Sequence, residues 1–216
     1  MTERWVCLDV GETLIDETRV FRTWAEVFGL PDLTLMAVLG GSIATGERPD
    51  DWRRFFHLIQ QPHWREQQSA FDERYGAFRH EDLYPDAIRA IDALRAGGYR
   101  VAITANQPAR RRSELEALDV GVEVMAMSEA MGVSKPDPAF FARTLELMGS
   151  PDPAEVAYVG DRVDNDVVPS AAAGMRAVWI RRGPWGLLHE DRDHAANLVV
   201  RSLDELVERI GEAWQR

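Results

Sequence analysis

The residues best suited to chemistry lie at the ends of short apolar segments that are typical of buried strands. They are acids, small polar residues and a lysine: Asp9, Gly11 and Thr13 at the end of 5–10; Thr104, Ala105 and Asn106 at the end of 99–105; Lys135; and Gly160, Asp161 and Asp166 after 155–159. In an open parallel sheet, ligands bind outside the carboxyl ends of the strands, so we expect these residues to meet in one crevice. Carboxylates there can serve as nucleophiles or metal ligands, and a lysine can bind an anion.

Lys135 is the single lysine among 25 basic residues, the rest being arginine. Arginine presents a planar fork with a fixed charge, whereas lysine is a compact point charge on a flexible stem. Two explanations are open. Either the single lysine is a chance exception in an arginine-rich chain, or position 135 lies in a site where only an ammonium group fits. Acids at several strand ends favour the second interpretation.

The apolar pattern predicts an α/β fold with a doubly wound parallel sheet. Strands are expected at 5–10, 99–105, 122–127, 155–159 and 176–181, and helices at 86–96, 108–118, 137–148, 165–173 and 202–213. Alternating strands and helices of this kind form a parallel sheet with helices on both faces. After the first strand, the pattern is helical at 16–28, 32–39, 50–60 and 63–77. We therefore expect a core domain of residues 1–15 and 81–216, with 16–80 inserted as a helical cap.

Composition and charge exclude several classes of protein. The chain is 45% hydrophobic and 28% charged, which is typical of a globular protein, and its net charge of -11 is unfavourable for binding nucleic acid or an anionic membrane. Cys7 is the only cysteine, so an internal disulfide is impossible and a buried apolar role is expected. The apolar run 6–8 is far shorter than the ~20 residues of a membrane span. We expect a cytoplasmic protein that binds neither nucleic acid nor membrane.

The same segments resemble the motifs of the haloacid dehalogenase (HAD) superfamily, most of whose members are Mg²⁺-dependent phosphatases. The first motif, an Asp nucleophile followed two residues later by a second Asp, is similar to Asp9-Val10-Gly11-Glu12-Thr13-Leu14. The second resembles Ile103-Thr104-Ala105-Asn106, and the third resembles Ser134-Lys135-Pro136-Asp137-Pro138. The fourth resembles Gly160-Asp161-Arg162-Val163-Asp164-Asn165-Asp166 followed by Ala173-Gly174-Met175. The resemblance implies a Rossmann-like core, and 16–80 corresponds to the helical cap of the family.

The resemblance also implies a role for each residue of these motifs. Asp9 would be the nucleophile that forms an aspartyl phosphate, while Lys135 and Thr104 would bind the phosphoryl group. Mg²⁺ would be held by Asp9, the Gly11 carbonyl and Asp161, with Asp166 holding a coordinated water, and the substrate would contact Thr13, Ala105 and Asn106. Arg19 and Arg22, which follow the nucleophile loop, are further candidates for substrate contact. A metal ion and an ammonium group can neutralise the repulsion between a carboxylate and a phosphoryl anion. The implied partner is a small phosphorylated metabolite, and a homodimer is compatible with the sequence.

Two positions depart from the family pattern. Gly11 stands where the family carries its second Asp, the usual general acid and base, so substrates with good leaving groups should react faster than alkyl phosphates. Glu12 is adjacent, but consecutive residues leaving a strand point in different directions, which makes it a poor substitute. In the second motif, either Thr104 or Ala105 faces the phosphate.

Two alternative functions share these motifs. A carbon–halogen hydrolase of the dehalogenase branch also lacks the second Asp and needs no metal, although two acids at Asp161 and Asp166 are superfluous without a cation. A catalytically degenerate member of the fold would bind Mg²⁺ and phosphate without turnover. Whatever the reaction, the cap is expected to determine which substrates are accepted, because it can close over the crevice.

Overall fold

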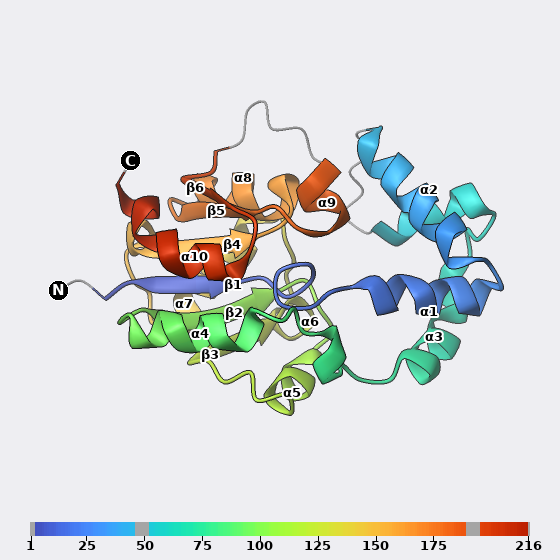
Figure 1. Ribbon diagram of the computed structural model, residues 1–216, viewed down its shortest axis with the longest axis horizontal. Coiled ribbons are helices and arrows are strands. Elements are labelled where there is room, and N and C mark those ends of the chain that lie inside the picture. The colour runs from blue at the N-terminus through green and yellow to red at the C-terminus, as the bar shows by residue number, and fades with distance from the viewer. Residues whose placement is uncertain (1–2, 46–51, 189–194, 216) are drawn as a thin grey trace.

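The computed structural model describes residues 3–45, 52–188 and 195–215, and a six-stranded parallel sheet lies at its centre (Figure 1). The strands are β1 (Trp5–Leu8), β2 (Arg100–Ala105), β3 (Val124–Met127), β4 (Val156–Gly160), β5 (Arg176–Ile180) and β6 (Leu198–Val200). Their order across the sheet is β3-β2-β1-β4-β5-β6, and all neighbouring strands are parallel. This doubly wound α/β arrangement confirms the predicted fold class.

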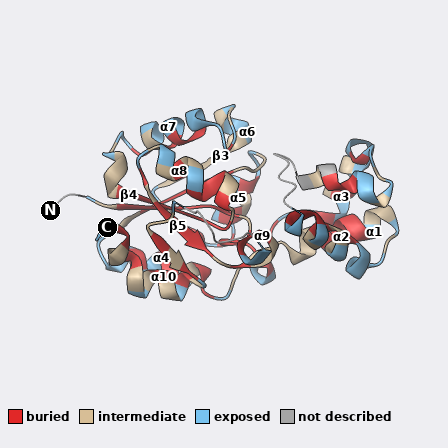
Figure 2. Ribbon diagram, turned by 90° about the horizontal axis from the view of Figure 1, so that it is seen from above, coloured by how far each residue is buried: buried red, intermediate tan, exposed pale blue. Residues whose placement is uncertain are grey.

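Helices cover both faces of the sheet, which explains why β1 is apolar on both of its sides. Helices α4 (Ala87–Ala96) and α10 (Leu203–Arg209) lie on one face, and α7 (Pro138–Leu147) and α8 (Val168–Ala172) lie on the other (Figures 1 and 2). In β1, Val6 and Leu8 pack with the first pair of helices, whereas Trp5 and Cys7 pack toward α7. Successive strand residues alternate between faces, so every residue of such a strand is buried.

The three central strands β2, β1 and β4 end within two residues of one another. Leu8 of β1 pairs with Ile103 of β2 and with Val159 of β4. The residues that follow these positions therefore leave the sheet side by side at its carboxyl edge.

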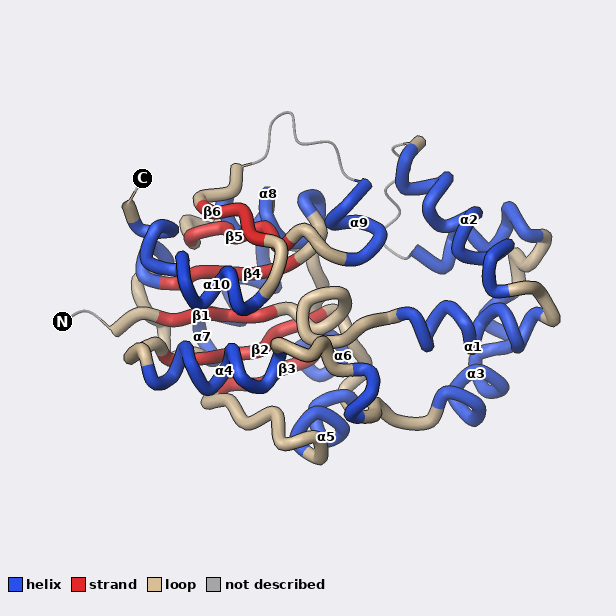
Figure 3. Tube along the Cα trace, viewed as in Figure 1, coloured by secondary structure: helices blue, strands red, loops and turns tan. Residues whose placement is uncertain are grey.

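The segment between β1 and α4 forms a helical cap next to that edge (Figure 3). It contains α1 (Thr18–Phe28), α2 (Asp32–Ala44), two 3₁₀ helices (Trp52–Ile59 and Trp64–Gln67) and α3 (Gln68–Tyr75). Trp24 is buried at its centre, with the ring of Phe71 stacked at 4.4 Å and that of Phe28 at 5.2 Å. The cap thus has its own aromatic core. Residues 50 and 51 of the helix expected at 50–60 lie outside the described residues.

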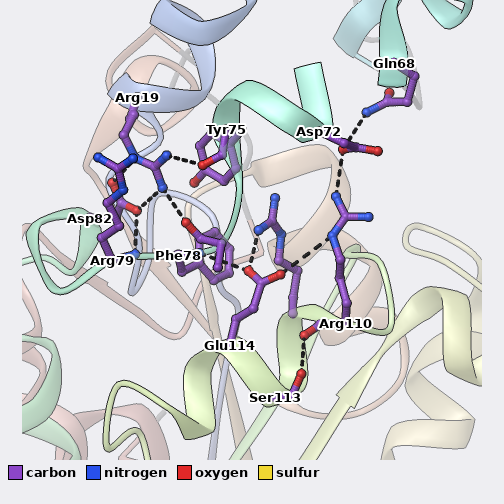
Figure 4. A network of polar contacts seen from close by, with 12 residues as sticks. Arg19, Gln68, Asp72, Tyr75, Phe78, Arg79, Asp82, Arg110, Ser113 and Glu114 are labelled. Carbon is purple, nitrogen blue, oxygen red and sulfur yellow. Dashed lines mark hydrogen bonds and ion pairs between the residues drawn. The ribbon is translucent and has the colours of Figure 1, made fainter. Parts of the chain in front are cut away.

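The chain enters and leaves the cap at adjacent points. Ile15 and Leu83 pair as an isolated antiparallel bridge, and the Asp16 amide donates to the Asp82 carbonyl at 2.8 Å. Nearby, Arg19 binds both carboxylate oxygens of Asp82, at 2.7 Å and 2.5 Å, and donates to the Tyr75 carbonyl at 2.7 Å (Figure 4). These contacts join α1 and the end of α3 to the core.

A second link lies between α3 and α5 (Arg111–Glu116) of the core. Arg110, the residue before α5, donates to the Asp72 carboxylate of α3 at 2.8 Å, and the Phe78 amide donates to Glu114 at 3.0 Å (Figure 4). The joint between cap and core is therefore polar on this side.

Several elements differ from the sequence-based expectation. Helices α6 (Ser128–Met131) and α9 (Gly183–Leu188) and strand β6 were not expected, because each is too short to carry a clear periodic pattern. The helix expected at 165–173 is a π-helix over Val163–Val167 followed by α8. Among the described residues, no single helix is long and apolar enough to span a membrane; α1 and α2 reach that length and composition only together, as a pair bent by 117°.

Candidate active site

Acidic side chains and the single lysine meet at the carboxyl edge of the sheet. Asp9 follows β1, Asp161 follows β4, and Asp166 lies in the π-helix beyond it. One carboxylate oxygen from each of these three residues lies within 4.8 Å of the other two. Lys135 places its Nζ atom 2.8 Å from Oδ1 of Asp9 and 2.6 Å from Oδ1 of Asp166. The structure thus brings together four residues from three separate parts of the chain: Asp9, Lys135, and the pair Asp161 and Asp166.

Neighbouring backbone and amide groups hold this cluster in place. A Cβ atom on Gly160 would lie 2.3 Å from Cγ of Asp166, so glycine is required for the Asp166 carboxylate to approach the end of β4. The Arg162 amide donates to Oδ2 of Asp166 at 3.0 Å. Asn106 fixes the backbone of Lys135, accepting from its amide at 2.8 Å and donating to its carbonyl at 2.9 Å. Asn106 therefore positions the lysine.

Burial and crowding of like charges control the protonation of the cluster. Burial raises the pKa of Asp9 to about 6, although the Lys135 ammonium opposes this, so Asp9 stays mostly ionised at neutral pH. Burial and the charges of Asp166 and Asp9 raise the pKa of Asp161 well above its usual value. Burial alone would lower the pKa of Lys135, but Asp166 and Asp9 hold it well above its usual value. One ammonium thus faces three carboxyl groups.

The donor set fits a hard divalent cation. Oδ2 of Asp161 is buried, and it has no hydrogen-bond partner within the described part of the chain. A buried polar atom without a partner is costly, and a cation bound beside it would remove that cost. Carboxylate oxygens are the ligands that Mg²⁺ prefers. Asp9, Asp161 and Asp166 are therefore suited to hold Mg²⁺.

A cavity of about 540 Å³ opens above these residues. Its walls come from both parts of the fold. The core contributes Asp9, Gly11, Asn106, Lys135, Arg162 and Trp185, and the cap segment contributes Glu17 and Arg53. The Arg162 guanidinium lies 5.3 Å from the centre of the Trp185 ring and binds Asp164 at 2.8 Å. An anionic substrate in this cavity would meet cationic groups even though the protein as a whole is acidic.

The structure orients Thr104 and Ala105 of the second motif away from the cavity. Oγ1 of Thr104 lies 3.3 Å from Sγ of Cys7 and 3.3 Å from Oγ1 of Thr144, on the α7 face of the sheet. Ala105 is buried in the core on the other face, and neither residue lines the cavity. A catalytic Thr104 would need its hydroxyl at the strand end, whereas period-two alternation places it beside Cys7.

Three further residues expected at the substrate also lie elsewhere. Thr13 is completely buried, and its carbonyl accepts a hydrogen bond from Arg182. Arg19 is bound to Asp82 at the joint between cap and core, and Arg22 is exposed and lies 3.4 Å from Asp32. None of the three lines the cavity.

Two glutamates beside Gly11 occupy different environments. The oxygens of Glu12 accept hydrogen bonds from the Glu17 amide, at 3.1 Å, and from the Tyr84 hydroxyl. Burial raises the pKa of Glu12 to about 7, against the lowering effect of the Tyr84 bond. Glu17 lines the cavity, and burial together with the negative charges of Glu12 and Asp9 raises its pKa to about 8.

Glu17, Arg162 and Trp185 are cavity residues that the sequence analysis missed. Arg162 lies inside the fourth motif and could have been noticed as a cation beside an anion site. No local signal marks Glu17 or Trp185, because each reaches the cavity only through the path of the folded chain.

Comparison with known proteins identifies the family. A model for haloacid dehalogenase-like hydrolases matches residues 3–174. A glyceraldehyde 3-phosphate phosphatase from Methanopyrus kandleri is 35% identical over 105 residues, covering 47% of this chain and 45% of that protein. A phosphoserine phosphatase from Thermus thermophilus is 34% identical over 131 residues, covering 59% of this chain and 51% of that protein. The matched region thus spans about half the length of these relatives.

A solved structure matches along nearly the whole chain. It is a HAD phosphatase from Thermococcus onnurineus, with a TM-score of 0.61 and 27% identity, covering 97% of this chain and 98% of that one. The similarity therefore includes the cap as well as the core.

Proposed function

The chain belongs to the haloacid dehalogenase-like hydrolases, and we propose that it hydrolyses a small phosphate monoester by Mg²⁺-dependent transfer of the phosphoryl group to Asp9. The observation that carries the proposal is the buried cluster of Asp9, Lys135, Asp161 and Asp166. It combines an ionised carboxylate, an ammonium 2.8 Å from it and a buried carboxylate oxygen that lacks a partner.

Each side chain of the cluster has a task in this reaction. Lys135 holds Oδ1 of Asp9, which leaves the second carboxylate oxygen to attack phosphorus. The ammonium also attracts the phosphoryl oxygens, and Asn106 keeps it in place. Mg²⁺ bound by the acids would supply the positive charge that brings the phosphoryl group against the carboxylate nucleophile. Arg162 adds a second cation at the wall of the cavity.

The relatives support a phosphate ester as the substrate class. Their names give two different substrates, glyceraldehyde 3-phosphate and phosphoserine, both small phosphorylated metabolites. The cavity of about 540 Å³ is large enough for a molecule of this class. Such metabolites and a buried free thiol at Cys7 agree with a cytoplasmic location.

A dehalogenase is the main alternative within the fold. Displacement of halide from carbon requires a nucleophilic Asp but no cation, so it gives no reason to bury Asp161 and Asp166 next to Asp9. The three-acid cluster therefore favours phosphoryl transfer.

The proposal is tested with a panel of aryl, acyl and alkyl phosphate monoesters, assayed for inorganic phosphate with Mg²⁺ and with EDTA. We expect release of phosphate that requires Mg²⁺ and is lost in Asp9→Asn. Chloride release from a 2-chloro acid in EDTA would support the dehalogenase. Mg²⁺ binding without turnover of any substrate would support a degenerate binding protein.

A further inference from the structure

The space beside Gly11 is filled by a carboxyl group from another part of the chain. A Cβ atom placed on Gly11 would lie 2.7 Å from Oε1, 3.0 Å from Cδ and 3.4 Å from Oε2 of Glu17. The first two distances are shorter than ordinary contacts of a Cβ atom, and the third is at the lower limit of van der Waals contact. The Glu17 carboxyl group therefore occupies the volume that a side chain at position 11 would take, two residues beyond the nucleophile Asp9.

The path of the chain delivers Glu17 to this position. After β1 a tight loop, visible in blue in Figure 1, turns back on itself: the amides of Leu14 and Ile15 both donate to the Val10 carbonyl at 2.9 Å. Glu17 is the residue that precedes α1, and its carbonyl accepts from the Phe21 amide at 3.2 Å. The start of the first cap helix thus lies beside the start of the loop.

Glu12 anchors this arrangement rather than competing with Glu17. One of its oxygens accepts from the Glu17 amide at 3.1 Å, and the other accepts from the Tyr84 hydroxyl. Both Glu12 oxygens are therefore already engaged by neighbouring groups of the protein. Glu12 and Glu17 both line the cavity that Asp9 and Lys135 share, but the Glu17 carboxyl group makes no hydrogen bond or ion pair with any described residue.

We propose that Glu17 is the general acid and base of the reaction, placed by the cap where Gly11 leaves room for its carboxyl group. This inference rests on the proposed phosphatase function and extends it to a catalytic residue outside the motifs. Gly11 and Glu17 then form a matched pair, because any larger residue at position 11 would displace the carboxyl group.

The chemistry balances in two steps. An Asp9 oxygen bonds to phosphorus, the ester P–O bond breaks with its electron pair on the alcohol oxygen, and the Glu17 carboxyl proton moves to that oxygen. The alcohol leaves, Asp9 is phosphorylated, and Glu17 is a carboxylate. Water then attacks phosphorus while Glu17 removes its proton. The bond from Asp9 to phosphorus breaks with its electron pair on Asp9, and phosphate leaves. Asp9 is again a carboxylate and Glu17 is again protonated.

Glu17→Gln tests the proposal through its dependence on the leaving group. An alkyl alcohol needs a proton to leave, whereas p-nitrophenolate does not. In this variant we expect kcat/KM for an alkyl phosphate such as glycerol phosphate to fall by about 10² to 10⁴, and kcat/KM for p-nitrophenyl phosphate to stay within about threefold. Because the second step also loses its base, kcat for the aryl ester should fall, and p-nitrophenol should appear in a burst of one equivalent.

Glu26→Gln is the matched control, because Glu26 lies on α1, the helix that Glu17 precedes, with an exposed side chain beside Arg74 and away from the cavity. It should leave both esters unchanged. Equal losses on both esters in Glu17→Gln, or alkyl turnover within about threefold of the parent, would overturn the assignment of Glu17. If the parent protein itself releases no phosphate from any ester, the proposed function fails and the inference falls with it.

A second pair of variants tests the same proposal in case Glu17→Gln does not fold. Glu17→Ala should lose alkyl turnover, and adding Gly11→Asp to it should restore at least about tenfold, because the vacated space then accepts a carboxylate at position 11. No recovery in a folded double variant that binds Mg²⁺ would contradict the matched pair.

Discussion

Nζ of Lys135 lies 2.8 Å from Oδ1 of Asp9, and both residues are buried at the carboxyl edge of the sheet. The contact joins the single lysine of the chain to the residue that follows its first strand. Lys135 and its two carboxylate partners have lost their hydration, and their mutual contacts offset that loss. The site therefore tolerates little change in the size or position of the cationic group.

Lys135→Arg should therefore impair the enzyme although it keeps the charge. The guanidinium is larger and forked, and a side chain that is 2% exposed has no room to expand. We expect kcat for the best phosphate ester to fall by about 10² to 10³, as when one preorganised donor is lost. The measurement is steady-state phosphate release, with circular dichroism to establish folding. Wild-type turnover in this variant would mean that chance alone preserved the lysine.

The acidic cluster predicts how stability depends on pH and Mg²⁺. Because the pKa of Asp161 is raised in the folded protein, the folded state binds more protons than the unfolded state at pH values between the two pKa values. The Tm of the protein in EDTA should thus fall as pH rises through that window. Asp161→Asn, which carries no titrating carboxyl group, should show a smaller fall.

Addition of Mg²⁺ should raise the Tm of the parent protein again, and should raise that of Asp161→Asn much less. At about 100 times its Kd, a ligand stabilises by about 2.7 kcal/mol, or roughly 5 to 10 °C in Tm for a chain of this size. Asp161→Asn should lose most of that shift in differential scanning calorimetry. A variant that keeps the full Mg²⁺ shift would remove Asp161 from the ligands.

Two residues of the second motif have different roles: Thr104 packs inside the protein, and Asn106 positions Lys135. Thr104→Val should change kcat little, because the Thr104 hydroxyl contacts Cys7 and Thr144 rather than the cavity. Asn106→Ala should lower kcat by at least about tenfold, because it frees the backbone of Lys135, and small misplacements at a reacting centre are costly. Phosphate release from both variants decides the matter; the reverse order of effects would show that Thr104 faces the substrate.

Gly11→Asp alone should give no gain with alkyl phosphates. The sequence presented Gly11 as a missing acid, so a preference for good leaving groups was expected. The structure fills that position with Glu17, whose Oε1 would lie 2.7 Å from the new Cβ atom. We expect kcat/KM for alkyl esters to be unchanged or lower and Tm to fall by a few degrees. A clear gain would show that Glu17 does not serve the site in the parent protein.

Two features of the sequence were enough to predict the fold and the acidic cluster: the periodicity of the apolar residues, and the acidic residues that follow the predicted strands. Asp9 and Asp161 each follow a short apolar run, and parallel strands that end level must bring such residues together. The single lysine and the order of the motifs then placed Lys135 in the same crevice.

Orientation and chain path were not predictable in the same way. Whether Thr104 or Ala105 faces the edge depends on the register of β2 against β1, where Cys7 pairs with Ala102. Glu17 reaches Gly11 because Glu12, with a φ of 50°, turns the chain back after β1. A positive φ at a glutamate has no sequence signature, so the replacement of the missing acid was invisible until the loop was seen.

The most direct test of this account is acid quenching during turnover of p-nitrophenyl phosphate with Mg²⁺, followed by mass spectrometry of the N-terminal peptide. We predict a phosphoryl group on Asp9, absent in EDTA and in Asp9→Asn, and accumulating in Glu17→Gln because its removal is slowed. Phosphate release with no phosphoryl group on Asp9 in any of these proteins, or undiminished turnover by Asp9→Asn, would contradict the account.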